Sequence, residues 1–222
     1  MAMYAKLRRV MLFGKKPIVV VGSISADLVL MTSRIPAVAE TVIGTDFQLH
    51  PGGKGANQAV AVARLGYPVR LIGRLGNDAF GTQLRMDLNS LGVDIAGVAT
   101  SEGPSGVAVT VVPQQGEKCI VVTPGANAKV TPLDLEGNIE IIRRAGIVLT
   151  QLEIPLETVV YLASICAREN VPLILDPASA MDLPQMFLDM FHGSRPIEPR
   201  LRSLQGPGMG TRAPILPPKW QK

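Results

Sequence analysis

Residues 51–66 bring together residue types that suit a ligand-binding turn. The segment begins Pro-Gly-Gly-Lys-Gly-Ala-Asn-Gln and ends at Gly66. Glycines let a backbone turn tightly and approach a ligand, and the apolar pattern that follows them is typical of a buried helix. We therefore expect a glycine-rich turn with unpaired backbone N–H groups that leads into a helix over about 55–65. Its predicted apolar side is Ala59, Val60, Val62, Ala63 and Leu65.

The spacing of these glycines excludes two common phosphate-binding loops. A Walker A loop has Ser or Thr directly after its lysine to hold magnesium, whereas Gly55 follows Lys54. A dinucleotide-binding turn has a third glycine where its helix packs on the sheet, and Gln58 stands at that position. The turn predicted at residues 22–27 lacks the dinucleotide pattern as well.

The segments around this turn predict an α/β fold. Short aliphatic runs are typical of buried parallel strands, and strands that alternate with helices imply a parallel sheet. The predicted strands are residues 18–21, 69–73, 145–149 and 172–175. The predicted helices are residues 55–65, 78–91 and 155–168, the last with Pro155 at its first position.

Two segments interrupt this alternation and predict a small lid. Residues 40–51 alternate polar and β-forming side chains, and residues 105–124 hold two short strands, 107–112 and 119–122, around a turn. We expect these segments to form an antiparallel piece that projects from the main sheet. A lid of this kind shelters a site from water.

The charge distribution argues against a nucleic-acid partner. The chain has 22 Lys and Arg against 18 Asp and Glu, a net charge of +4. Residues 1–16 hold five basic residues and no acidic one, and residues 185–222 hold six basic and two acidic ones. The body, residues 17–184, is therefore acidic. A nucleic-acid surface needs a clustered basic patch with stacking aromatic residues, and the aromatic content is only 4%.

The cysteines and the hydropathy predict a cytoplasmic protein. Cys119 and Cys166 have no metal-binding or redox spacing, so we expect free thiols in a reducing compartment. No apolar run reaches the length that crosses a membrane, so we expect no membrane partner. Residues 185–222 are rich in Pro, Gly and Arg and have no clear period, which predicts a disordered tail.

From about residue 17 to residue 184 the chain resembles the ribokinase-like carbohydrate kinase family. The resemblance implies a three-layer α/β sandwich with a parallel central sheet and a β lid. The strings at 52–58 and 151–153 resemble the family's ribose kinases more than its fructose or adenosine kinases. The motifs that carry the resemblance are residues 21–27, 52–58, 73–78, 123–127, 151–153 and 176–178.

The resemblance also implies an activity and a site. Members transfer the terminal phosphate of ATP, with Mg²⁺ and in some cases a monovalent cation, to a sugar hydroxyl, which is O5 of ribose in the ribose kinases. Sugar hydroxyls both donate and accept, so carboxylates, an amide and an ammonium group suit them. A homodimer through the lid is implied too. The implied sugar-binding residues are Ser25, Ala26, Asp27, Gly53, Lys54, Gly55, Ala56, Asn57 and Glu153.

Each polar residue of this set has a structural alternative. Asp27 suits a turn or a helix cap, and Asn57 suits the N-terminus of a helix. Glu153 precedes Pro155, so its charge suits the start of the helix that follows. Lys54 suits a solvated surface.

The resemblance ends at about residue 184. The family's catalytic base and anion hole lie in a Gly-Ala-Gly-Asp motif, which an Asn-x-x-Glu motif precedes, and the sequence contains neither. We therefore expect a C-terminally incomplete domain, from a shifted reading frame or a truncation, and assign no catalytic base. Strand 172–175 would then be an aggregation-prone edge. Three hypotheses follow: a sugar kinase by descent, an inactive sugar-binding or interaction fragment, and a fragment without a stable fold.

Overall fold

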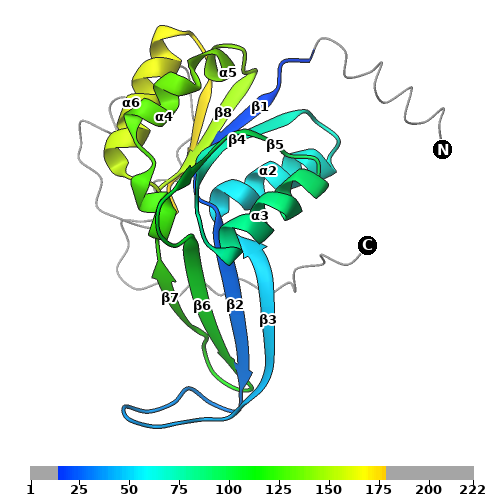
Figure 1. The fold of residues 1–222 in the computed structure, drawn as a ribbon, viewed down its shortest axis with the longest axis vertical. Helices are drawn as coiled ribbons and strands as arrows, with labels where there is room; N and C mark the ends of the chain where they lie inside the picture. The colour runs from blue at the N-terminus through cyan, green and yellow to red at the C-terminus, as the bar shows by residue number, and fades with distance from the viewer. Residues whose placement is uncertain (1–14, 179–222) are drawn as a thin grey trace, which may run out of the picture.

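The computed structural model describes residues 15–178, which form two sheets (Figure 1). The larger sheet carries all the described α-helices, and the smaller sheet projects from it as a long arm (Figure 1). The predicted tail at 185–222 and nearly all of the predicted extension at 1–16 lie outside the described residues. Along residues 15–178 no helix has the length and apolar character that crossing a membrane requires.

The larger sheet has five parallel strands in the order β5-β4-β1-β8-β9. This arrangement confirms the parallel sheet that the alternation of strands and helices predicts. β5 is not predicted from the sequence, because this edge strand has no aliphatic run. The strands are β1 (Ile18–Val21), β4 (Val69–Gly76), β5 (Asp94–Ser101), β8 (Ile147–Gln151) and β9 (Leu173–Asp176).

Helices cover both faces of this sheet, which gives the three layers expected from the family resemblance. One face packs on α2 (Lys54–Arg64) and α3 (Ala79–Ser90). The other packs on α4 (Pro132–Gly137), α5 (Ile139–Arg143) and α6 (Leu156–Arg168).

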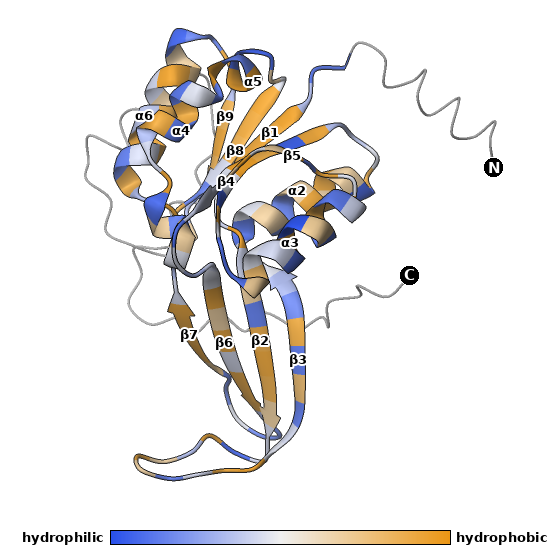
Figure 2. Cartoon of the chain, viewed as in Figure 1, coloured by the Kyte–Doolittle hydropathy of each residue, from blue (hydrophilic) through white to orange (hydrophobic). Residues whose placement is uncertain are grey.

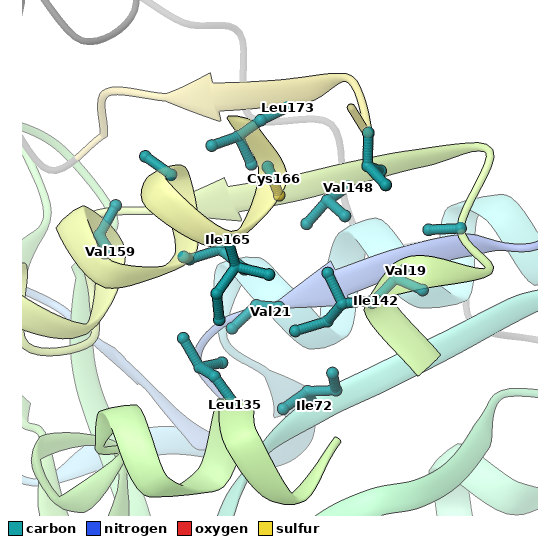
Figure 3. Close-up of a cluster of buried hydrophobic side chains, with 14 of the residues drawn as sticks. Val19, Val21, Ile72, Leu135, Ile142, Val148, Val159, Ile165, Cys166 and Leu173 are labelled. Atoms are coloured by element: carbon teal, nitrogen blue, oxygen red, sulfur yellow. The ribbon is translucent and has the colours of Figure 1, made fainter. Parts of the chain in front are cut away.

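The side chains of β1 alternate between these two layers because successive residues of a strand point to opposite faces. Val20 belongs to the cluster under α2 and α3, whereas Val19 and Val21 belong to the opposite cluster (Figure 3). Apolar residues accordingly dominate β1, β8 and β9 (Figure 2).

Two details of the helices differ from the sequence predictions. Leu65, predicted on the apolar side of α2, is 86% exposed, because it follows the last helical residue and caps the helix instead. Pro155 is the N-cap of α6 rather than its first residue. Gly66 has a φ of 78° and ends α2 in the left-handed conformation that suits glycine.

The smaller sheet has four strands in the order β3-β2-β6-β7. They are β2 (Ser25–Thr32), β3 (Gly44–Gly52), β6 (Gly106–Pro113) and β7 (Cys119–Thr123). The central pair, β2 and β6, is parallel, so the sheet is mixed and the prediction of an antiparallel piece is wrong for that pair. The sequence predicts a turn at 22–27, but β2 already begins at Ser25.

Two side chains of the larger domain fix the points where the central strands leave it. Asn127 accepts a hydrogen bond from the backbone N of Ile24 and donates one to its carbonyl, both at 2.9 Å, directly before β2. Asp78 accepts bonds from the backbone N (3.0 Å) and Oγ (2.6 Å) of Ser105, directly before β6. Both strands of the arm are therefore anchored where they begin.

Candidate functional site

The main sequence-predicted residues lie where β1 and β8 end and α2 begins. Asp27 is the third residue of β2, the strand that follows β1 in the chain, and Lys54 is the first residue of α2. Glu153 lies two residues after the end of β8. In open α/β sheets, ligands bind at the carboxyl ends of the strands. The fold thus places these residues where a ligand site is expected.

Glu153 occupies the N-terminus of α2. Its Oε2 accepts hydrogen bonds from Ser23 Oγ at 2.6 Å and from the backbone N of Lys54 at 3.2 Å. Its Oε1 forms an ion pair with Lys54 Nζ. A carboxylate at this end of a helix is favoured by the helix dipole. The structural alternative from the sequence is that Glu153 favours the start of the helix that follows it, α6. The structure instead places its carboxylate at the start of α2.

The surroundings of Glu153 lower its pKa. Partial burial on its own would raise the pKa, but the hydrogen bonds from Lys54 and Ser23 outweigh it because they stabilise the carboxylate. Glu153 is therefore charged at neutral pH. The positive charge of Lys54 balances its negative charge in the ion pair.

Asp27 is the contrasting carboxyl group of the site. Its side chain lies against the Cα of Gly52, where any Cβ would overlap it. Among residues 15–178 no hydrogen bond or ion pair to this carboxyl group is found. Burial raises its pKa, the charge of Glu153 raises it further, and His50 and Lys54 oppose the shift. Asp27 is thus an acceptor with no described partner of its own.

The glycines of the turn are required by close contacts. Gly53 has a φ of 89°, and a Cβ there would lie 2.7 Å from the carbonyl oxygen of Ser23. A Cβ on Gly55 would lie 2.7 Å from the carbonyl carbon of Gly22. The start of α2 therefore packs directly on the backbone that follows β1.

The first N–H groups of α2 already have partners, which corrects the expectation that they are unpaired. Lys54 N bonds to Glu153, Gly55 N bonds to Ser23 Oγ at 3.5 Å, and Ala56 N bonds to Ser23 O at 2.9 Å. These contacts explain in physical terms why the glycine-rich turn is not a phosphate cradle.

The remaining predicted residues divide into exposed and buried ones. Asn57 is exposed in the first turn of α2, and Gly53 is the N-cap, so the capping alternative for Asn57 is wrong. The side chains of Ser25, Ala26 and Ala56 are buried. Of the polar candidates in α2, only Lys54 and Asn57 are accessible to a ligand.

Several residues that support the site escape sequence reasoning. Ser23 bonds to Glu153, and Asn127 fixes Ile24 from 103 residues away. Gln58 and Gln151 bond to each other at 2.6 Å. All four lie within the motifs shared with the family, which is the only signal that the sequence offers for them.

Neither a metal-binding cluster nor an open phosphate site at the start of α2 is found among the described residues. No group of three or more His, Cys, Asp or Glu side chains that could hold a metal ion occurs within residues 15–178. The helix N-terminus nearest the site is bonded to Glu153 and Ser23.

Comparison with known proteins places this geometry in a family. The chain is 41% identical to the ribokinase of Bacillus subtilis (strain 168) over 172 residues, which is 78% of this chain and 59% of that protein. It is 38% identical to the ribokinase of Arabidopsis thaliana over 199 residues, which is 86% of this chain and 52% of that protein. The chain thus spans little more than half the length of these two relatives.

Two solved ribokinase structures share the fold of this chain. The structure of Arabidopsis thaliana ribokinase complexed with ribose and ATP superposes with a TM-score of 0.73 at 37% identity, over 79% of this chain and 58% of that one. A ribokinase from Thermotoga maritima superposes with a TM-score of 0.71 at 33% identity, over 78% of this chain and 57% of that one. The pattern of the pfkB family carbohydrate kinases matches residues 15–199. The chain belongs to the pfkB family of carbohydrate kinases.

Proposed function

We propose that the described residues form the sugar-binding half of a carbohydrate kinase site, which takes D-ribose as the acceptor of the ATP γ-phosphate and yields ribose 5-phosphate. The observation that carries the proposal is the placement of the carboxyl group of Asp27 beside the Lys54–Glu153 ion pair, at the carboxyl ends of β1 and β8. The relatives named as ribokinases, and the homologue solved with ribose and ATP, support ribose as the sugar.

The chemistry of the side chains suits a neutral polyol. Asp27 accepts hydrogen bonds from sugar hydroxyls, Lys54 donates them, and the amide of Asn57 does both. The glycine at position 53 lets the sugar ring approach the backbone. The smaller sheet, which leaves the larger domain at Ser25 and Gly106, acts as the lid that limits water access.

ATP and Mg²⁺ belong to the proposed reaction of the family, as does a monovalent cation in some members. A homodimer through the lid is proposed as well, and the exposed Ile120, Val121 and Val122 of β7 are its candidate contacts. A cytoplasmic location agrees with the free thiols of Cys119 and Cys166.

An alternative function is that this chain binds the sugar without phosphorylating it. The observation that favours it is the bonding of the first N–H groups of α2 to Glu153 and Ser23, which leaves no phosphate cradle at that helix end. ADP release from ATP, Mg²⁺ and ribose by the purified chain distinguishes the two functions, because only the kinase produces it.

The sugar-binding proposal is tested by calorimetric titration of the full 222-residue chain with ribose. We expect binding, and we expect Asp27→Asn to weaken it about 10- to 100-fold, the range for a hydrogen bond to a charged group. The matched control is Asp87→Asn, which removes a carboxylate from α3. Equal affinities for the unaltered chain and the Asp27→Asn variant would refute the assigned role of Asp27.

A further inference from the structure

A chain of side-chain hydrogen bonds links α2 to the ends of two strands. Gln151, the last residue of β8, donates through Nε2 to Gln58 Oε1 at 2.6 Å. Gln58 donates through its own Nε2 to Oδ2 of Asp176, the last residue of β9, at 3.3 Å. Gln151 and Asp176 are also direct neighbours in the pairing of β8 with β9.

The direction of these bonds is set by the carboxylate. A carboxylate only accepts hydrogen bonds, so Gln58 must present its NH₂ group to Asp176 and its oxygen to Gln151. Gln151 must then present its own NH₂ group to Gln58. Each amide has one orientation that satisfies the chain, which gives the contact a defined geometry.

The bond between the two glutamines adds a second attachment of α2 to the end of β8. Lys54 and Gln58 are one helical turn apart and therefore lie on the same face of α2. Lys54 contacts Glu153, and Gln58 contacts Gln151, two residues earlier in the chain. Two polar contacts along one face supplement the apolar packing of α2 in fixing its rotation about its axis.

The amide of Gln151 is bonded on one side only. Its side chain is fully buried, and its Oε1 has no hydrogen-bond partner within residues 15–178. A Cβ on Gly22 would overlap this oxygen, so the amide fills the space against the backbone after β1. A buried acceptor without a partner destabilises the folded state, so the unpaired oxygen offsets part of what the bond from Nε2 to Gln58 contributes.

We propose that Gln58 and Gln151 are positioning residues for sugar binding. Their amide contact helps to fix the rotation of α2, and with it the placement of Lys54 and Asn57 relative to Asp27. This inference rests on the proposed sugar-binding function. Neither glutamine is assigned a contact with the sugar itself.

The test measures ribose affinity and thermal stability in parallel, with the full chain. Methionine has the length of glutamine without its polar atoms, so Gln58→Met and Gln151→Met remove the contact with little change in volume. We expect each variant to raise the Kd for ribose about ten-fold, near the upper end of what one hydrogen bond contributes. The double variant should raise it no further, because both residues act through one contact.

Thermal stability separates positioning from a structural role. We expect the melting temperature of Gln151→Met to change little, because the lost bond to Gln58 and the removed unpaired oxygen act in opposite directions. Gln83→Met is the matched control, because Gln83 is an exposed glutamine of α3. It should leave the Kd unchanged.

Three different results would overturn the inference. Failure of the unaltered chain to bind ribose overturns the proposed function and this inference with it. Binding by the unaltered chain with unchanged Kd in both Gln58→Met and Gln151→Met overturns the inference alone. Loss of the folded state in both variants assigns the pair a structural role and also overturns it.

Discussion

The close packing of α2 on the backbone after β1 predicts that Gly55→Ala destabilises the protein. Alanine is the better helix former by up to about 1 kcal/mol, so propensity alone predicts a gain in stability. In the structure, however, a Cβ at position 55 would lie 2.7 Å from the carbonyl carbon of Gly22 and 2.8 Å from both N and O of Ser23. Side-chain rotation cannot relieve contacts with backbone atoms.

The net effect can be estimated from these two opposing terms. Overpacking of a tight site costs about 1–3 kcal/mol, and the required shift also disturbs the bonds of Ser23 and Glu153 to the start of α2. We expect a net loss of about 2 kcal/mol in the free energy of unfolding. For a chain of this size the melting temperature should fall by about 4–8 °C.

The assay is urea and thermal unfolding, with a second Gly→Ala variant as control. Gly137 is the last residue of α4, and a Cβ there meets no atom within 4 Å. Gly137→Ala should therefore stabilise the protein, by up to about 1 kcal/mol. The reasoning is refuted if Gly55→Ala is as stable as the unaltered chain, or gains stability as Gly137→Ala does.

Three further predictions concern stability. Asn127→Leu should reduce the free energy of unfolding by about 2–4 kcal/mol in urea titrations, because it leaves the N–H and C=O of Ile24 without their partner; a loss below about 1 kcal/mol would contradict this. Arg74→Met should cost about 3 kcal/mol, because it leaves the carboxylate of Asp134, only 9% exposed, without its two-bond partner; an unchanged urea midpoint would count against it. The pKa of Glu153 is lower in the folded state than its ordinary value of 4.5, so its contribution is present above that value and disappears as the pH falls through the folded-state pKa. Urea midpoints from about pH 7 to pH 3 should fall less steeply for Glu153→Gln, and identical slopes would show that Glu153 does not cause the loss.

Local patterns were sufficient for most elements of the larger domain, but not for β5, α4 and α5. The aliphatic run of β1 and the apolar period of α2 each lie within a dozen residues, so the sequence alone indicates them. β2 is not among the predicted strands, although it contains the aliphatic run Leu28–Met31. Its first residues are Ser, Ala and Asp, and its place depends on Asn127, which lies 103 residues from Ile24.

Contacts between residues far apart in the chain also limit the prediction of the site from the sequence. The family resemblance proposes Asp27, Lys54 and Glu153 as neighbours, but no local pattern indicates that Glu153 lies at the N-terminus of a helix 99 residues earlier in the chain. Nor does the sequence distinguish the two carboxyl groups. Their opposite pKa shifts arise from partners that only the folded chain brings close, with Lys54 and Ser23 bonded to Glu153 and no described bond to Asp27.

A sugar site at the carboxyl ends of β1 and β8 can be seen directly in a crystal structure of this chain with ribose. We expect the sugar ring beside Gly53, with hydroxyl groups within hydrogen-bond distance of Asp27 and Lys54. Crystals grown with saturating ribose that hold the sugar elsewhere, or none at this position, would contradict it.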